Sequence, residues 1–155
     1  MEEVRVFVET SWKGPERKDG VAAWLAECMR RGEPITRQGL VHLEDGTQAR
    51  GTLMALANAL HILKKPCRVR IYVECGHVRS AVQNGWHRQW RENGWRNAKG
   101  QAVRNAEVWE ILMEKAAPHA CTMEGGRHEY RAVMQDAARR ELEEWKRRRQ
   151  NAGKR

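Results

Sequence analysis

Two glutamates stand where a pair of apolar strands is predicted to end. Glu9 follows the alternating β-branched run at 4–8, and Glu74 closes the run at 68–74. If these strands are parallel neighbours, both carboxylates meet at the carboxyl edge of one sheet, where open α/β sheets bind ligands. Either acid alone could be a solvated rim charge, but two acids that end two apolar strands favour a functional site.

Basic charge is the second chemical feature, and it is concentrated in two segments. The net charge is +9. Residues 85–105 carry five basic residues against one acidic residue, and residues 139–155 carry eight against three, so the rest of the chain is neutral. Concentrated positive charge indicates a partner that bears phosphates. Tryptophans interleave the charges of 85–105, whereas the last segment could equally be a solvated, disordered end.

The elements that must position these residues alternate between strands and helices. Strands are predicted at 4–8, 20–28 and 38–43, and the short turns between them predict an antiparallel meander. Leucine and alanine spacing predicts a buried helix over 48–64 that Pro66 ends, and the strand at 68–74 that follows it should be parallel to the first. The remaining predicted elements are short helical pieces over 77–93, a loop over 94–103, a helix over 104–116, a strand over 120–123 and a long helix from 129.

This order predicts one α/β domain, an α+β mixed sheet of five strands flanked by helices, in which three antiparallel strands precede the parallel ones. We expect the domain over 1–145 and a disordered basic tail over 146–155. No apolar run approaches the ~18 residues of a membrane span, and the acidic start Met1-Glu2-Glu3 predicts no signal peptide. The four cysteines form no CxxC pair, so we expect reduced thiols in a monomeric, cytoplasmic protein.

Several local strings resemble bacterial ribonuclease H of type 1, over about residues 3–145. The strongest string resembles the basic protrusion of that family and the helix after it: Trp86, Trp90, Gly94-Trp95, Lys99, Val103-Arg104-Asn105 and Trp109. Arg50 and Leu53-Met54-Ala55 are similar to the first helix of the family. The segment Phe7 to Ser11 resembles the strand that carries its first catalytic carboxylate. The resemblance implies a ribonuclease H-like fold.

The resemblance also implies a catalytic site of four carboxylates that hold two metal ions, with Mg²⁺ the expected ion and Mn²⁺ an alternative. Glu9 and Glu74 fall where the family has aspartates. Thr52 falls where it has a glutamate, and Asp136 falls on the fourth position, for which Glu129 is a substitute. The mobile histidine of the family has no clear match, although His128 could serve.

The implied partner is an RNA/DNA hybrid or another duplex nucleic acid, with no role for a membrane. The residues that the resemblance assigns to its binding are Thr47, Gln48, Arg50, Arg88, Arg91, Trp95, Arg96, Lys99 and Arg104. One hypothesis is a metal-dependent endonuclease that cuts the RNA strand of the hybrid, with altered or weakened activity. The second is a binding module whose catalysis is impaired, which Thr52 favours. A third is a nuclease of this fold that acts on DNA.

Overall fold

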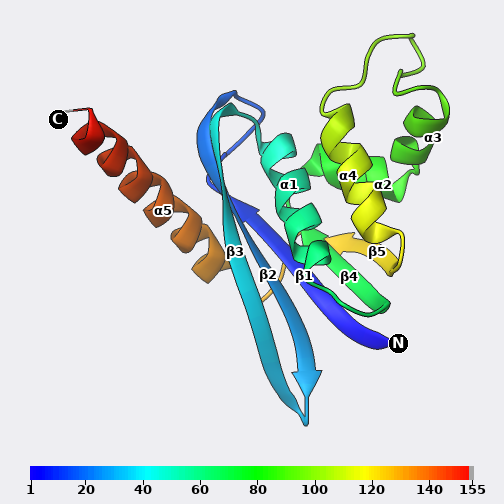
Figure 1. The fold of residues 1–155 in the computed structure, drawn as a ribbon, viewed down its shortest axis with the longest axis horizontal. Coiled ribbons are helices and arrows are strands. Elements are labelled where there is room, and N and C mark those ends of the chain that lie inside the picture. The colour runs from blue at the N-terminus through cyan, green and yellow to red at the C-terminus, as the bar shows by residue number, and fades with distance from the viewer. Residues whose placement is uncertain (154–155) are drawn as a thin grey trace.

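Five strands form one mixed sheet in the order β3-β2-β1-β4-β5. The computed structural model describes residues 1–153 (Figure 1). β1 (Glu2–Thr10) pairs antiparallel with β2 (Lys18–Arg30), which pairs antiparallel with β3 (Glu33–Gly46). On its other side β1 pairs parallel with β4 (Cys67–Val73), and β4 pairs parallel with β5 (Ala120–Gly125). The predicted mixed sheet, antiparallel first and parallel afterwards, is confirmed.

The hairpin of β2 and β3 is longer than the sequence indicated. Arg31 and Gly32 form its turn with φ angles of 54° and 81°, a geometry that matches the twist of the paired strands. Pro34, which lies between the two predicted strands at 20–28 and 38–43, belongs to β3 and pairs with Met29. A proline is tolerated there because β3 is an edge strand and needs no N–H donor on its open side.

Strand alternation divides the core between the two faces of the sheet. Val4, Val6 and Val8 belong to the larger core, which packs against α1 (Gln48–His61) and α4 (Ala106–Ala116). Phe7 belongs to a smaller core on the opposite face, beneath α5 (Arg131–Ala152). Because successive strand residues point to opposite faces, Glu9 lies on the Phe7 side. α2 (Gly76–Gln83) and α3 (Trp86–Glu92) follow β4.

The last helix is longer than expected and extends beyond the sheet (Figure 1). We predicted a disordered tail from residue 146, but α5 continues to Ala152. Arg149 explains part of this extension, because it stacks over the Trp145 ring at 4.8 Å and pairs with Asp19 at 2.8 Å. Residues 154–155, the end of the predicted tail, lie outside the described residues. Within residues 1–153, no helix is long and apolar enough to cross a membrane.

Candidate functional site

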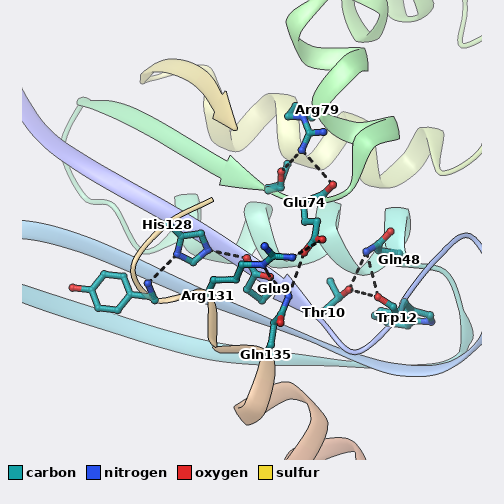
Figure 2. Close-up of polar contacts among 11 residues, drawn as sticks. Glu9, Thr10, Trp12, Gln48, Glu74, Arg79, His128, Arg131 and Gln135 are labelled. Carbon is teal, nitrogen blue, oxygen red and sulfur yellow. Dashed lines mark hydrogen bonds and ion pairs between the residues drawn. The ribbon is translucent and has the colours of Figure 1, made fainter. Parts of the chain in front are cut away.

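Parallel pairing brings the two predicted glutamates to the same edge of the sheet. Val8 is the register partner of Val73, so Glu9 on β1 lies beside Glu74, the residue that follows the end of β4. Figure 2 shows both carboxylates approached by side chains from the last helix and from the segment before it. Arg79 holds the end of β4 in place, since its Nη1 donates to the carbonyl oxygens of Val73 at 2.9 Å and Glu74 at 3.3 Å.

Glu9 is a buried acid with two hydrogen-bond donors from the chain. Only 1% of the residue is exposed. Its Oε2 accepts from His128 Nε2 at 2.8 Å, and its Oε1 accepts from Gln135 Nε2 at 3.0 Å. Burial raises the pKa of the Glu9 carboxyl above its ordinary value, while the hydrogen bonds from His128 and Gln135 oppose that shift. The two donors are therefore what makes an ionised Glu9 tolerable in this position.

His128 orients Glu9 and is itself enclosed. Its side chain is 1% exposed, and its ring lies 4.4 Å from that of Phe7. Its Nδ1 accepts from the Tyr130 backbone N–H at 3.2 Å, which leaves Nε2 as the donor to Glu9. Both ring nitrogens are thus satisfied in the neutral form that carries its hydrogen on Nε2. This arrangement is typical of a positioning residue.

Glu74 is the open half of the pair, with 45% of its side chain exposed. Its Oε1 accepts from Arg131 Nη2 at 2.9 Å, and its Oε2 accepts from Gln135 Nε2 at 3.3 Å. The Gln135 amide therefore bridges the two glutamates. Arg131 also approaches Glu9, with Nε 4.0 Å from Oε1. The site joins two acids, one imidazole, one amide and one guanidinium.

Asp136, the acid that we predicted on the last helix, is not part of this cluster. Its carboxylate pairs with Arg139 at 2.6 Å and with Arg140 at 2.8 Å, which are neighbours three and four residues along the same helix. Gln135, one residue earlier, reaches the glutamates instead. The substitute candidate, Glu129, pairs with Arg5 at 3.0 Å away from the two glutamates.

Thr52 lies next to the site but is buried in the core. It is 1% exposed, and its hydroxyl contacts the thiol of Cys75, the residue that follows Glu74. Burial raises the pKa of the Cys75 thiol, and hydrogen bonds from the Val78 and His77 backbone oppose that change more than the Thr52 hydroxyl does. Thr52 thus adds no negative charge to the edge where Glu9 and Glu74 meet.

Arg131 and Gln135 were not among the predicted site residues, although the sequence contains a signal for them. The α5 residues at 131, 134, 135 and 138 follow the i, i+3, i+4, i+7 spacing of one helix face. Met134 and Ala138 are the buried members of that face. Because the apolar pair marks the side that meets the sheet, Arg131 and Gln135 must lie on the same side, and Asp136 must point away from it.

A network of charged and hydroxyl groups fixes the segment that carries His128. The Arg5 guanidinium pairs with Glu27 at 2.6 Å and with Glu129 at 3.0 Å, and the Tyr130 hydroxyl donates to Glu27. The hydrogen bond from Arg5 lowers the pKa of Glu129, and the hydrogen bond to Glu27 raises the pKa of Tyr130. Residues 128–130 are thereby tied to β1 and β2.

The predicted basic protrusion projects beside α4, away from α5 (Figure 1). It consists of α3 and a loop that is closed by backbone hydrogen bonds from Trp95 to Trp90 at 2.6 Å and from Val103 to Trp95 at 2.9 Å. Trp95 is half-buried against the core with a φ of 63°, rather than free on the surface. The five basic side chains of this segment are exposed: Arg88, Arg91, Arg96, Lys99 and Arg104.

The other predicted binding residues, which surround the start of α1, are engaged within the domain. Thr47 caps the helix by accepting from the Arg50 N–H at 3.3 Å. Gln48 donates to the Thr10 hydroxyl at 3.3 Å. Arg50 pairs with Glu107 at 2.6 Å and so links α1 to α4. These side chains make contacts within the domain. The basic side chains of the protrusion are exposed, although Arg91 also pairs with Glu110 of α4 at 3.2 Å.

Comparisons with known proteins show the family. The RNase H family model matches residues 1–125, so this chain belongs to the ribonuclease H family. A ribonuclease H from Bradyrhizobium sp. (strain ORS 278) is 37% identical over 121 residues, which are 75% of this chain and 71% of that protein. A ribonuclease H from Brucella anthropi is 43% identical over 75 residues, or 48% of each chain. The match thus spans about half the length of some of these relatives.

Solved structures support the same fold. A type 1 ribonuclease H with the type 2 active-site motif has a TM-score of 0.72 at 21% identity, covering 90% of this chain and 70% of that one. The LC11-RNase H1 structure in complex with RNA/DNA hybrid has a TM-score of 0.57 at 10% identity, covering 86% of this chain and 91% of that one. The family match ends at residue 125, before the segment that supplies His128, Arg131 and Gln135.

Ribonuclease H proteins generally depend on a divalent metal, but the residues at this edge do not fit a two-metal site. Such a site needs several anionic ligands. Here Thr52 and Gln135 are neutral, and Arg131 adds a positive charge beside Glu74. Within residues 1–153, no group of three or more His, Cys, Asp or Glu residues could hold a metal ion.

Proposed function

We propose that this chain is a duplex-binding ribonuclease H domain that takes RNA/DNA hybrids and cleaves their RNA strand weakly or not at all. The observation that carries the proposal is the state of the two glutamates. Arg131 pairs with Glu74, and Gln135 donates to both acids, so the chain itself already supplies one positive charge and two hydrogen bonds to the carboxylates that a catalytic metal would bind.

The basic protrusion supports the binding half of the proposal. Its five exposed basic side chains lie on one projecting segment, and cations of this kind attract phosphates at a range set by salt. A related fold has been solved in complex with RNA/DNA hybrid, which makes that duplex the first ligand to test. Contacts to the 2′-hydroxyls across a shallow minor groove would distinguish a hybrid from DNA.

Hydrolysis of the RNA strand with Mg²⁺ or Mn²⁺ is the second candidate function. It is favoured by the position of Glu9 and Glu74 on adjacent parallel strands and by the exposure of Glu74. On this hypothesis Asp136 would have to leave its ion pairs with Arg139 and Arg140 before it could join the two glutamates. The free thiols of all four cysteines suit a reducing compartment, and we propose the cytoplasm as the place of action.

One labelled hybrid tests both candidates. Binding is measured by fluorescence anisotropy in EDTA, and cleavage is then followed with Mg²⁺ and with Mn²⁺ on the same material. We expect saturable hybrid binding and a cleavage rate far below that of an ordinary ribonuclease H assayed beside it. Comparable cleavage would establish the nuclease. No preference for nucleic acid duplexes over a polyanion such as heparin would contradict specific binding.

A further inference from the structure

All four carboxylate oxygens of the Glu9 and Glu74 pair accept a hydrogen bond from the chain. Glu9 receives one from His128 and one from Gln135, at 2.8 and 3.0 Å. Glu74 receives one from Arg131 and one from Gln135, at 2.9 and 3.3 Å. A divalent cation bound by oxygen would have to compete with these donors at every one of the four atoms.

The Arg131 guanidinium lies between the two carboxylates, where a positive charge reduces their mutual repulsion. Two carboxylates on adjacent strand ends repel each other, and the buried one is costly to ionise without a partner. The Arg131 guanidinium binds Glu74 directly, and its Nε lies 4.0 Å from Glu9. That Nε is buried and, within residues 1–153, has no hydrogen-bond partner. The guanidinium is held between the two acids at the cost of one unsatisfied N–H.

Gln135 completes the change of chemistry. A carboxylate in its place would add a third anion and could hold a hard cation, whereas an amide NH₂ has two hydrogens and supplies one to each glutamate. Arg131 and Gln135 lie four residues apart on one helix face. The same turn of α5 therefore places a cation beside the two glutamates and a neutral amide where a third carboxylate would complete a metal site.

We propose that Arg131 is the resident cation of this site, which takes the electrostatic place of a divalent metal, and that Gln135 closes the remaining ligand positions. The carboxylate pair does not bind Mg²⁺ or Mn²⁺ at millimolar concentration. It becomes a metal site when the arginine is removed and an acid is supplied. This inference does not depend on hybrid binding, because it concerns the carboxylate pair alone.

The first experiment is a titration of the full chain with MnCl₂ and MgCl₂, followed by thermal unfolding and by isothermal titration calorimetry. We expect no saturable heat, and a Tm that changes no more than it does with an equal ionic strength of NaCl. Saturable binding of either metal to the wild-type protein with millimolar or tighter affinity, lost in Glu74→Gln, would overturn the proposal.

The second experiment converts the site. In Arg131→Ala/Gln135→Asp, three carboxylates meet without the guanidinium, a ligand set that suits Mn²⁺. We expect Mn²⁺ at tenfold excess over its Kd to raise the Tm of this variant by about 3–6 °C. The matched control is Arg147→Ala, which removes the same charge from the exposed part of the same helix and should gain no metal response.

Two single variants test the proposal even if Arg131→Ala/Gln135→Asp fails to fold: Arg131→Lys and Arg131→Gln. Lysine keeps the charge, so this protein should remain indifferent to Mn²⁺, whereas Arg131→Gln should acquire a weak response. Equal metal responses in Arg131→Lys and Arg131→Gln, or a folded conversion variant that ignores Mn²⁺, would show that the guanidinium charge is not what excludes the metal. Loss of hybrid binding in the wild type would leave these outcomes unchanged, so the binding half of the proposed function fails separately, whereas its weak-cleavage half rests on the same carboxylate pair as this inference.

Discussion

The charged side chains at the carboxyl edge of the sheet have partners within the chain, whereas several on the basic protrusion are exposed to solvent. At the edge, Glu9 and Glu74 are matched by donors from α5 and the segment before it. On the protrusion, Arg88, Lys99 and Arg104 are exposed. A group that is already paired must lose its partner before it can bind a ligand, while an exposed cation loses only water and screening ions. This contrast is the basis of our proposal that the chain binds a duplex and cleaves it weakly or not at all.

The largest expected effect is a loss of affinity for RNA/DNA hybrid when basic residues of the protrusion are replaced. Alanine at Arg88, Arg96 and Lys99 together should weaken hybrid binding about 100-fold near 0.1 M salt, since each lost phosphate contact reduces the salt slope by ~0.9. Anisotropy titrations across a range of salt concentrations measure both quantities. Alanine at Arg139, Arg140 and Arg147, which have acidic partners on α5, removes the same charge elsewhere. Equal losses of hybrid affinity in both triple variants would show that the exposed cations of the protrusion bind the duplex no better than paired cations on α5.

The next largest effect is expected at the carboxyl edge, where a substitution should lower the free energy of unfolding without changing hybrid affinity. His128→Ala removes a donor from the buried Glu9 carboxylate, which should lower the free energy of unfolding by about 2 kcal/mol. Urea unfolding measures this change, and hybrid affinity should stay within about twofold because the protrusion is untouched. His61→Ala, at an exposed position on α1, serves as the control. A His128→Ala protein of unchanged stability would mean that Glu9 does not need its donor.

A smaller effect concerns pH. Burial raises the pKa of Glu9 above its ordinary value of 4.5, so the folded state keeps this proton to a higher pH than the unfolded state does. The stabilisation that comes from protonated Glu9 is complete below pH 4.5 and is lost as pH rises through the folded pKa. The stability of the wild type relative to Glu9→Gln should therefore fall over that range, as measured by urea unfolding at several pH values. A difference that rises with pH would show a lowered pKa.

The smallest effect is expected at Arg50, which the sequence assigned to nucleic-acid binding. Its partner Glu107 is 65% exposed, and surface pairs contribute about 0.5 kcal/mol. Arg50→Ala should change stability by that amount and hybrid affinity by less than twofold. A loss of affinity as large as that of Arg88→Ala, measured side by side, would place the start of α1 in the binding surface.

The fold and half of the site could be predicted from the sequence because their signals are local. Strand alternation and the crossover helix place Glu9 and Glu74 on neighbouring strands, and the structure pairs those strands in parallel. The partners of the two acids could not be predicted from the resemblance, which implies a carboxylate on the last helix. Asp136 is such a carboxylate, but its ion pairs with Arg139 and Arg140 lie within its own helix.

The length of the last helix could not be predicted for a different reason. Residues 146–152 have the composition of a solvated basic end, and a helix with so few apolar residues depends on tertiary contacts. These contacts come from distant parts of the chain: Asp19 and Glu44 pair with Arg149, and His42 lies 5.1 Å from the Trp145 ring. Pairings across more than a hundred residues leave no local pattern.

The network of Arg5, Glu27, Glu129 and Tyr130 has a consequence for the time course of chemical access. Because it fastens residues 128–130 to β1 and β2, a reagent reaches Glu9 only when that segment detaches, and the rate of labelling reports the frequency of local opening. Glu74, with 45% of its side chain exposed, needs no such opening. A carbodiimide pulse should therefore modify Glu74 rapidly. Glu9 should be modified more slowly, at a rate similar to that of hydrogen exchange at the Tyr130 amide.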